Sequence, residues 1–383
     1  MDVARKVRKV VILGSAHPLR GGLAAYNERL ARALIKHGDQ VKLINFSLQY
    51  PGFLFPGKTQ FSNEPPPNDL DIETCVNSIN PINWIRVGWR IKKMQPDLLI
   101  IKFWIPFMGP CLGSIARIVR KNRKTKIISI LDNIVPHEKR PGDRLLSAYF
   151  VKAVDGFIAM SKQVLDDLDL FDKKKAREFC PHPLYDHFGD LTDKPTAITK
   201  LGLDESSKYI LFFGFIRDYK GLDILLDAMA KEKLEKLKLK LLVAGEFYTD
   251  SKPYFEKMEK LGLQDRVVMS NDFIPDGEVA NFFNAADIVV QPYKNATQSG
   301  VTQIAYHFEK PMITTNVGGL AEIVPNEKVG FVVNPDTDEI TEAIFRFYNE
   351  NREDEFISNI KIEKLKYSWE RMIETIDKLI KTK

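Results

Sequence analysis

The chain has 383 residues, a length that predicts two domains of about 190 residues each. Hydrophobic residues make up 44% and charged residues 28%, which is ordinary globular composition. The 56 Lys and Arg exceed the 51 Asp and Glu by only five, so the net charge does not indicate a nucleic-acid-binding protein. The three cysteines are far apart and outside any Cys-x-x-Cys pair, so they indicate no zinc site and favour a reducing, cytoplasmic location.

Two apolar runs resemble membrane-directed segments. Residues Val10–Gly14 follow a basic stretch, but this run is far shorter than the apolar region of a signal peptide and predicts a buried strand instead. The run Leu98–Val119 contains Lys102, Arg117 and two prolines, which a helix in lipid would carry only at high energetic cost. We therefore predict no transmembrane segment.

The first half of the chain alternates apolar runs and helical patterns, which predicts a parallel sheet with helices on both faces. Helices are expected at about 22–37 and 84–93. The segment 50–67, rich in Pro, Gly and Phe, interrupts the alternation and is either a functional loop or a surface loop. The predicted strands are Val10–Leu13, Val41–Phe46, Leu98–Lys102, Ile127–Leu131, Gly156–Met160 and Phe179–Cys180.

A second α/β series follows the polar segment Asp186–Pro195, which predicts a domain boundary near residue 188. We expect domains at 1–188 and 189–360, both doubly wound and facing each other across a cleft. Helices are expected at 337–348 and 367–381, and we expect segment 361–383 to pack back onto the first domain. The predicted strands are Tyr209–Phe213, Lys240–Ala244, Arg266–Met269, Ile288–Gln291, Met312–Thr314 and Gly330–Val333.

The most informative stretch is Phe212–Gly221, where an apolar strand runs through Gly214 into Arg217 and Lys220 and then opens a helix. Gly214 allows a sharp turn at the end of the strand. Ligands of open α/β sheets bind at this edge, and helix N–H groups add partial positive charge. The stretch therefore predicts a diphosphate site, with a solvated basic turn as the alternative.

Two further loops follow strands of the same domain. In one, Ser299-Gly300 opens a helix that continues with Val301 and Thr302, and Ser299 is either part of an anion site or simply the helix N-cap. In the other, Val317–Glu322 places glycines before a helix start. Glu322 can accept hydrogen bonds from a sugar or ribose, or it can be a first-turn carboxylate favoured by the helix dipole.

In the first domain, Gly21-Gly22 lies between the first predicted strand and the helix that follows it. Glycines leave room for a ligand to approach the backbone, but a turn and a helix cap would use glycine equally well. The sequence leaves both interpretations open.

These motifs resemble those of family 4 glycosyltransferases of the GT-B fold, over nearly the whole length of the chain. The stretches that carry the resemblance are the Gly21-Gly22 loop, Ile158–Lys162, Pro181–Pro183, Gly214–Gly221 and Val317–Glu322. In that family the Arg and Lys bind the leaving diphosphate of a nucleotide-sugar, and the matching helix start adds backbone donors. The resemblance implies retention of anomeric configuration, no cofactor beyond the nucleotide-sugar and no essential metal. The implied donor-binding residues are Gly21, Gly22, Gly214, Arg217, Lys220, Ile274, Gln298, Ser299, Gly300, Val301, Thr302 and Glu322.

The sequence departs from the family pattern at a pair of glutamates that commonly face the donor. Counting back from Lys310-Pro311, those positions fall on Ala296 and Ile304, whose side chains accept no hydrogen bond. Gln298 and Gln303 lie close by and can substitute as neutral amides. The identity of the donor sugar and base is therefore left open.

The segment Leu131–Arg140 follows a predicted strand of the first domain, so its polar groups can face the cleft. The resembling family often has a His-containing loop here, which makes Asp132 and His137 candidate catalytic residues beside Arg217 and Lys220. A surface histidine is the alternative.

The segment Asn83–Lys93 mixes aromatic and basic residues, and Trp104, Phe107 and Met108 follow in the next loop. Such a cluster suits peripheral contact with the inner face of a membrane or a lipid-linked acceptor. An ordinary helix that buries Trp84, Ile85, Val87, Gly88 and Ile91 is the interpretation we prefer.

The sequence thus predicts a retaining, hexosyltransferase-like glycosyltransferase that moves a sugar from a nucleotide diphosphate donor to an acceptor hydroxyl. The expected acceptor is a glycan or a lipid-linked glycan, in the synthesis of surface polysaccharide or glycolipid, and no nucleic-acid partner is expected. The alternatives are a nucleotide-sugar epimerase of similar fold and a non-catalytic nucleotide-sugar-binding protein.

Overall fold

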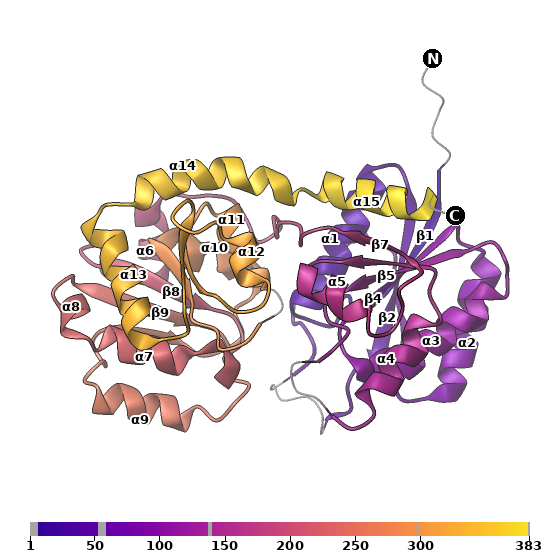
Figure 1. Cartoon of the computed structure of the whole chain (residues 1–383), viewed down its shortest axis with the longest axis horizontal. Coiled ribbons are helices and arrows are strands. Elements are labelled where there is room, and N and C mark those ends of the chain that lie inside the picture. Colours follow the sequence, from indigo (N-terminus) through magenta and orange to yellow (C-terminus); the bar gives the residue numbers. More distant parts are fainter. Residues whose placement is uncertain (1–6, 53–58, 137–139, 297–298, 382–383) are drawn as a thin grey trace, which may run out of the picture. The chain divides into compact units, whose positions relative to one another are not determined.

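The structure, a computed structural model, describes residues 7–52, 59–136, 140–296 and 299–381 (Figure 1). It divides into two compact units. The first contains residues 1–182 and 368–383, and the second contains residues 183–367. Each unit has its own sheet and its own core.

The first unit is built on a sheet of seven parallel strands in the order β3-β2-β1-β4-β5-β6-β7. All six residues of β4 are buried, because helices cover both faces of a parallel sheet. The strand order reverses between β1 and β4, which is where ligands bind in such sheets. The strands are β1 (Lys9–Leu13), β2 (Gln40–Leu48), β3 (Ile72–Asn77), β4 (Leu98–Phe103), β5 (Lys126–Leu131), β6 (Gly156–Ala159) and β7 (Ala176–Phe179).

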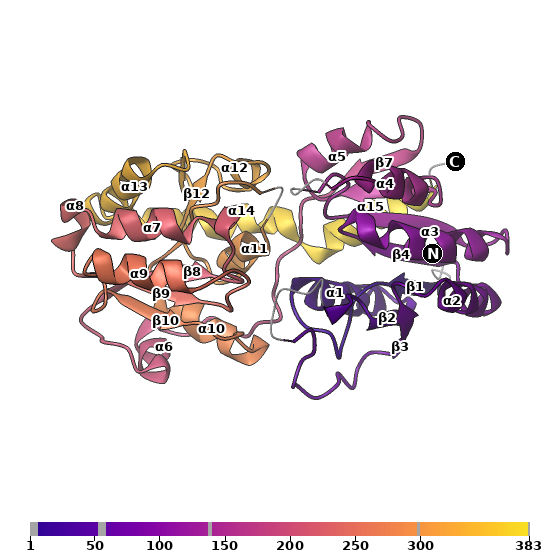
Figure 2. The same ribbon diagram turned by 90° about the horizontal axis from the view of Figure 1, so that it is seen from below.

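Right-handed crossovers place α1 on one face of this sheet and α2, α3 and α4 on the other. In Figures 1 and 2, α3 lies beside both α2 and α4, and the residue contacts agree. The C-terminal helix α15 packs against α1, β6 and β7. The helices of this unit are α1 (Gly22–Lys36), α2 (Pro81–Met94), η2 (Pro106–Met108), α3 (Gly109–Arg120), α4 (Asp143–Val151), α5 (Lys162–Leu168) and α15 (Trp369–Lys381).

The second unit repeats the design with six parallel strands in the order β10-β9-β8-β11-β12-β13. Here the strand order reverses between β8 and β11. The strands are β8 (Lys208–Phe213), β9 (Leu239–Ala244), β10 (Val267–Ser270), β11 (Ile288–Gln291), β12 (Met312–Thr315) and β13 (Gly330–Val333).

The connections of the second unit are mostly helical. The segment 183–188 also belongs to this unit, where the Leu184 N–H donates to the Tyr367 carbonyl over 2.9 Å. The helices are α6 (Lys194–Leu201), η3 (Asp218–Lys220), α7 (Leu222–Met229), α8 (Glu232–Glu235), α9 (Lys252–Lys260), α10 (Asp276–Ala285), α11 (Gly300–His307), α12 (Leu320–Ile323), α13 (Thr337–Asn349), α14 (Glu353–Glu363) and η4 (Lys364–Tyr367).

The predicted α/β architecture with two doubly wound sheets is confirmed, and every predicted strand overlaps an observed one. The strand β3 was missed because its mixed pattern, half exposed along the sheet edge, lacks the apolar run of a central strand. The helix α2 begins at Pro81 rather than Trp84, since the Asn80 side chain caps it by accepting from the Ile82 and Asn83 N–H groups.

Two segments outside the sheets bear on the sequence predictions. In the segment 50–67, whose residues 53–58 lie outside the description, Phe61 forms an antiparallel bridge with Leu19 and the Gln60 carbonyl accepts from the Arg20 N–H. The segment therefore packs next to Gly21 on the approach to α1. Among the described residues, no helix combines the length and apolar character needed to cross a bilayer.

Candidate functional site

The candidate site of the second unit lies where β8 ends. Gly214 has φ of +97° and Gly221 has φ of +70°, and between them the chain makes the short helix η3. A Cβ atom on Gly221 would lie 1.9 Å from the Pro292 carbonyl oxygen. Only glycine therefore lets the loop after β8 approach the loop after β11 so closely.

The first part of this loop is held by backbone hydrogen bonds to the segment after β9. The Gly214 N–H donates to the Ala244 carbonyl, and the Ile216 N–H donates to the Glu246 carbonyl. A Cβ on Gly245 would lie 2.1 Å from the Gly214 carbonyl oxygen, so the two segments touch backbone to backbone. The loop that carries Arg217 and Lys220 is thus anchored before the two cations begin.

Arg217 and Lys220 are two cations for which the described residues provide no ion pair or hydrogen-bonding partner for the side chain. A Cβ atom added to Gly214 would lie 3.0 Å from Lys220 Nζ and 3.5 Å from the Val301 side chain of α11. The Lys220 ammonium therefore lies close to the turn at Gly214 and to the start of α11. Desolvation, together with the nearby charge of Arg217, lowers the pKa of Lys220 to about 7. Two neighbouring cations without a carboxylate create a strong preference for a bound anion.

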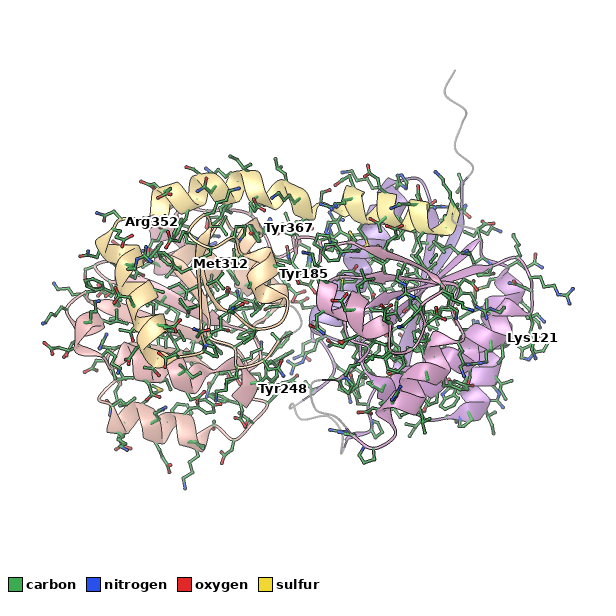
Figure 3. The ribbon with its side chains drawn as sticks, in the orientation of Figure 1. Lys121, Tyr185, Tyr248, Met312, Arg352 and Tyr367 are labelled. Carbon is green, nitrogen blue, oxygen red and sulfur yellow. The ribbon has the colours of Figure 1, made fainter. Side chains whose placement is uncertain are left out.

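Aromatic rings surround this pair of cations. The Arg217 guanidinium lies 5.2 Å from the centre of the Tyr248 ring, which Figure 3 labels, and Lys220 Nζ lies 5.4 Å from the centre of the Tyr293 ring. Phe215 stacks on Tyr248 with ring centres 4.2 Å apart. The rings limit the water around the cations and attract them through their π faces. The sequence did not indicate Tyr248, because no spacing relates the loop after β9 to Arg217.

The start of α11 is a capped helix. Ser299 Oγ accepts from the Val301 N–H over 3.2 Å and lies 3.2 Å from the Tyr293 hydroxyl, and Thr302 Oγ1 donates to Gln291 Oε1 over 3.1 Å. The N-cap interpretation of Ser299 is therefore confirmed. Because these hydroxyls are engaged within the protein, α11 offers an anion its dipole and backbone rather than the side chains of Ser299 and Thr302.

Two other predicted residues lie at the same edge of the sheet. Glu322 is exposed on the single turn α12, after Gly318 with φ of +50°. Ile274 is partly buried after β10, next to Phe273, whose ring centre is 6.3 Å from that of Phe215. The loops after β8 and β10 thus meet through aromatic rings.

The glutamate positions of the family pattern are apolar and closed in this chain. Ala296 and Ile304 are both buried. Gln303 is fully buried, and neither its amide oxygen nor its amide nitrogen has a hydrogen-bonding partner among the described residues. Gln298 lies outside the described residues. Burying an amide without a hydrogen-bonding partner is unfavourable. After Arg217 and Lys220, the Gln303 side chain is thus another polar group of this unit without a partner among the described residues.

In the first unit, the predicted residues lie at the carboxyl edge of the sheet. Gly21, with φ of +95°, precedes α1, and Gly22 is its first residue. Asp132 follows β5 and pairs with Lys102 of β4, with Nζ 2.9 Å from Oδ1. His137 lies outside the described residues.

The partner of Asp132 is a buried lysine. Lys102 Nζ lies 3.5 Å from the centre of the Tyr26 ring and 3.9 Å from Met160 Sδ. Burial lowers the pKa of Lys102, and Asp132 opposes that shift by stabilising the charged form. In the sequence Lys102 is only an interruption of an apolar run, and no local pattern relates it to Asp132. Among the described residues, no cluster of three or more His, Cys, Asp or Glu side chains could hold a metal ion.

The second unit matches a known family. Residues 193–363 match the family model described as Glycosyl transferases group 1. This segment is similar to group 1 glycosyltransferases. The resemblance to glycosyltransferases seen in the sequence is thereby confirmed.

Curated proteins that are similar to parts of this chain carry related names. A D-inositol 3-phosphate glycosyltransferase of Segniliparus rotundus is 34% identical over 37% of this chain and 32% of its own length. A lipopolysaccharide core biosynthesis mannosyltransferase of Rhizobium meliloti is 27% identical over 50% of this chain and 54% of its own length. The chain spans about a third to a half of the length of the curated relatives it matches.

Solved structures show the GT-B fold for the whole chain. A sucrose-phosphate synthase from Thermosynechococcus elongatus has a TM-score of 0.76 and 16% identity, with 98% of each chain covered. Anabaena HepE, solved in complex with UDP and glucose, has a TM-score of 0.73 and 16% identity, covering 98% of this chain and all of its own. The predicted fold class is confirmed by these matches.

Gly221→Ala tests the close approach between the loops after β8 and β11. We expect it to destabilise the protein by more than about 2 kcal/mol, because alanine combines left-handed strain with a clash against the Pro292 carbonyl. Gly262→Ala is the matched control, since Gly262 has φ of +65° but nothing within 4 Å of the added Cβ. Equal losses in urea unfolding would show that the clash is absent.

Lys220→Met tests the unfavourable environment of the cation. The folded-state pKa of about 7 lies below the ordinary value of 10.5, so the unfolded chain binds the extra proton between these values and stability rises with pH there. We expect the substitution to raise the melting temperature near pH 7 and the gain to vanish as the pH approaches 10.5. Lys260→Met, at an exposed position of α9, should show no such pH dependence.

Asp132→Asn tests the buried ion pair of the first unit. We expect a loss of about 3 kcal/mol in the free energy of unfolding, because Lys102 would remain buried without a carboxylate. Adding Lys102→Met should restore most of that loss. A single substitution that leaves the urea midpoint unchanged would contradict the importance of the pair.

Proposed function

We propose that the protein transfers a sugar from a nucleoside diphosphate donor to an acceptor hydroxyl. The observation that carries this proposal is the pair Arg217 and Lys220, which lacks a described anionic partner beside the first turn of α11. A diphosphate between the two loops would supply the missing negative charge. The group 1 match over residues 193–363 supports the same chemistry.

The charges explain how such a site assists transfer. When the bond between the sugar and the diphosphate breaks, negative charge grows on the departing phosphate oxygens. Arg217, Lys220 and the dipole of α11 stabilise that charge more in the transition state than in the ground state. Protonated Lys220 can also donate hydrogen bonds to the leaving group.

We propose that transfer retains the anomeric configuration, as in family 4 glycosyltransferases, and proceeds without a resident metal ion. Attack on the face that the diphosphate leaves requires no protein nucleophile, because the departing phosphate can take the acceptor proton. In many transferases a metal ion neutralises the negative charge that grows on the departing diphosphate. Here Arg217, Lys220 and the N-terminus of α11 would neutralise that charge instead.

The donor is proposed to be a UDP-sugar, with a hexose as the sugar. HepE, which shares the fold, was solved with UDP and with UDP and glucose, and this supports the choice. The segment around Ile274 would approach the base. Glu322 is exposed and has no side-chain partner among the described residues, so it would accept a hydrogen bond from a sugar or ribose hydroxyl. Gln303 offers a neutral amide next to the closed position of Ile304.

For the acceptor we propose a glycan or lipid-linked glycan, which the name of the related mannosyltransferase supports. Asp132, whose side chain is 15% exposed and lies 2.9 Å from Lys102 Nζ, would accept a hydrogen bond from the acceptor hydroxyl. His137 stays a candidate catalytic residue, and Gly21 and Gly22 stay candidate donor-binding residues of the first unit.

The double variant Arg217→Ala with Lys220→Ala tests the central assignment. We expect the affinity for UDP to fall at least about 100-fold by calorimetry, since two charge-assisted contacts would be lost. Lys260→Ala, an exposed cation on α9, is the matched control and should bind UDP like the wild type.

Affinity unchanged in the double variant would remove the diphosphate site from this loop. Incubation of the wild type with a panel of UDP-, GDP- and ADP-sugars then separates the remaining alternatives. Epimerised donor formed without any acceptor would indicate an epimerase. Binding with neither transfer nor hydrolysis above background would indicate a non-catalytic nucleotide-sugar-binding protein.

A further inference from the structure

The helix α2 presents an apolar face to solvent. Ile82, Ile85 and Trp89 are 63%, 51% and 47% exposed, and their spacing of three and four residues places them on one side of the helix. The opposite side, with Val87, Gly88 and Ile91, is buried. Large apolar side chains gathered in this way mark an interaction surface more often than scattered ones do.

The exposure of Ile85 corrects the sequence-based core stripe, which included it. A Cβ on Gly88 would lie 2.9 Å from the Ile118 side chain of α3, so α2 approaches α3 through its glycine side. Because α2 packs against α3 on the side of Gly88, the side chains of Ile85 and Trp89 face solvent. The helix is therefore anchored by one side and leaves the other uncovered among the described residues.

The same face is strongly basic. The helix α2 carries Arg86, Arg90, Lys92 and Lys93 and no acidic residue in its sequence. Arg86 and Lys93 are exposed and lie at helical spacing from Trp89, and Lys92 Nζ stands 4.0 Å from the centre of the Trp89 ring. Of the four, Arg90 is paired, with Glu73. The uncovered apolar strip is thus bordered by cations.

Neighbouring helices extend this character. The sequence of α3 contains Arg117 and Arg120 and no acidic residue. On α4, Leu145 is 76% exposed, and Tyr149 contacts the Arg117 guanidinium with 3.7 Å between the guanidinium carbon and the ring centre. The helices α2, α3 and α4 cover one face of the sheet (Figures 1 and 2). Basic and apolar groups therefore recur along that face.

We propose that the outer face of α2, formed by Ile82, Ile85, Arg86, Trp89 and Lys93, binds a membrane surface that contains anionic phospholipid. Apolar side chains and a tryptophan ring enter the boundary between headgroups and acyl chains, while the cations pair with phosphates. A second copy of the chain fits this face less well. A two-fold dimer would bring Arg86 and Lys93 against their own equivalents without an intervening anion.

The experiment uses the full chain and lipid vesicles without any nucleotide-sugar, so it is independent of glycosyl transfer. Wild-type protein should cosediment with vesicles of phosphatidylcholine mixed with phosphatidylglycerol and not with phosphatidylcholine alone. Added salt should weaken the binding by screening the charges. Tryptophan emission should shift to shorter wavelength as Trp89 leaves water.

Two double variants separate the apolar and the charged contributions. Ile85→Ser with Trp89→Ser, and Arg86→Glu with Lys93→Glu, should each weaken binding at least about tenfold, given the contribution expected of each cation near an anionic surface. The matched control is Ile35→Ser with Lys36→Glu on α1, where Ile35 is 41% exposed and Lys36 is also exposed on the other face of the sheet. Circular dichroism checks that each variant is folded.

Three outcomes would overturn the proposal. If the wild-type protein cosediments with neither kind of vesicle, this face does not bind lipid. Equal weakening by the α1 control shows only general attraction of a basic protein. A third outcome is a wild-type protein that forms a concentration-dependent dimer. If the Ile85→Ser with Trp89→Ser variant loses this dimer but binds vesicles as the wild type does, the face belongs to a second copy of the chain.

Discussion

A shortage of negative charge at the end of β8 governs the candidate site. Arg217 and Lys220 are brought together by a loop that the backbone fixes at both ends, through the contact of Gly214 with the segment after β9 and through Gly221 against Pro292. The side chains that lie against the two cations are the aromatic rings of Tyr248 and Tyr293, which carry no negative charge to relieve the repulsion. The fold thereby holds two cations in an arrangement that the protein alone does not stabilise, a property typical of binding sites.

In the first unit, by contrast, the buried cation has a carboxylate partner. Lys102 is buried in the sheet, and Asp132 supplies the compensating charge from the next strand. An ion pair of this kind is weak evidence for stability, because the desolvation of both groups offsets much of their attraction. Its effect is to fix the position of the Asp132 carboxylate at the carboxyl edge of the sheet. The two sheets therefore share a topology and differ in the charge each presents.

The sequence allowed the fold to be predicted because the central strands are largely apolar runs, as in the Tyr209–Phe213 part of β8, and helical spacing follows them. The loop carrying Arg217 and Lys220 was also predictable, since its glycines and cations are adjacent in the sequence. Tyr248 and Lys102 were not, because their roles depend on strand order and on contacts between distant segments. The exposed side of α2 was misjudged because periodicity identifies an apolar stripe without saying which part of it a neighbouring helix covers.

The near-neutral pKa of Lys220 has a consequence for the handling of protons. Around neutral pH the empty protein is a mixture of molecules with charged and uncharged Lys220, and the uncharged fraction relieves the repulsion with Arg217. An anion that settles beside Lys220 favours the charged form, so its arrival draws protons from the solvent and its departure returns them. The heat measured on binding therefore contains the ionisation heat of the buffer, and the occupancy of the site is coupled to the acidity around it.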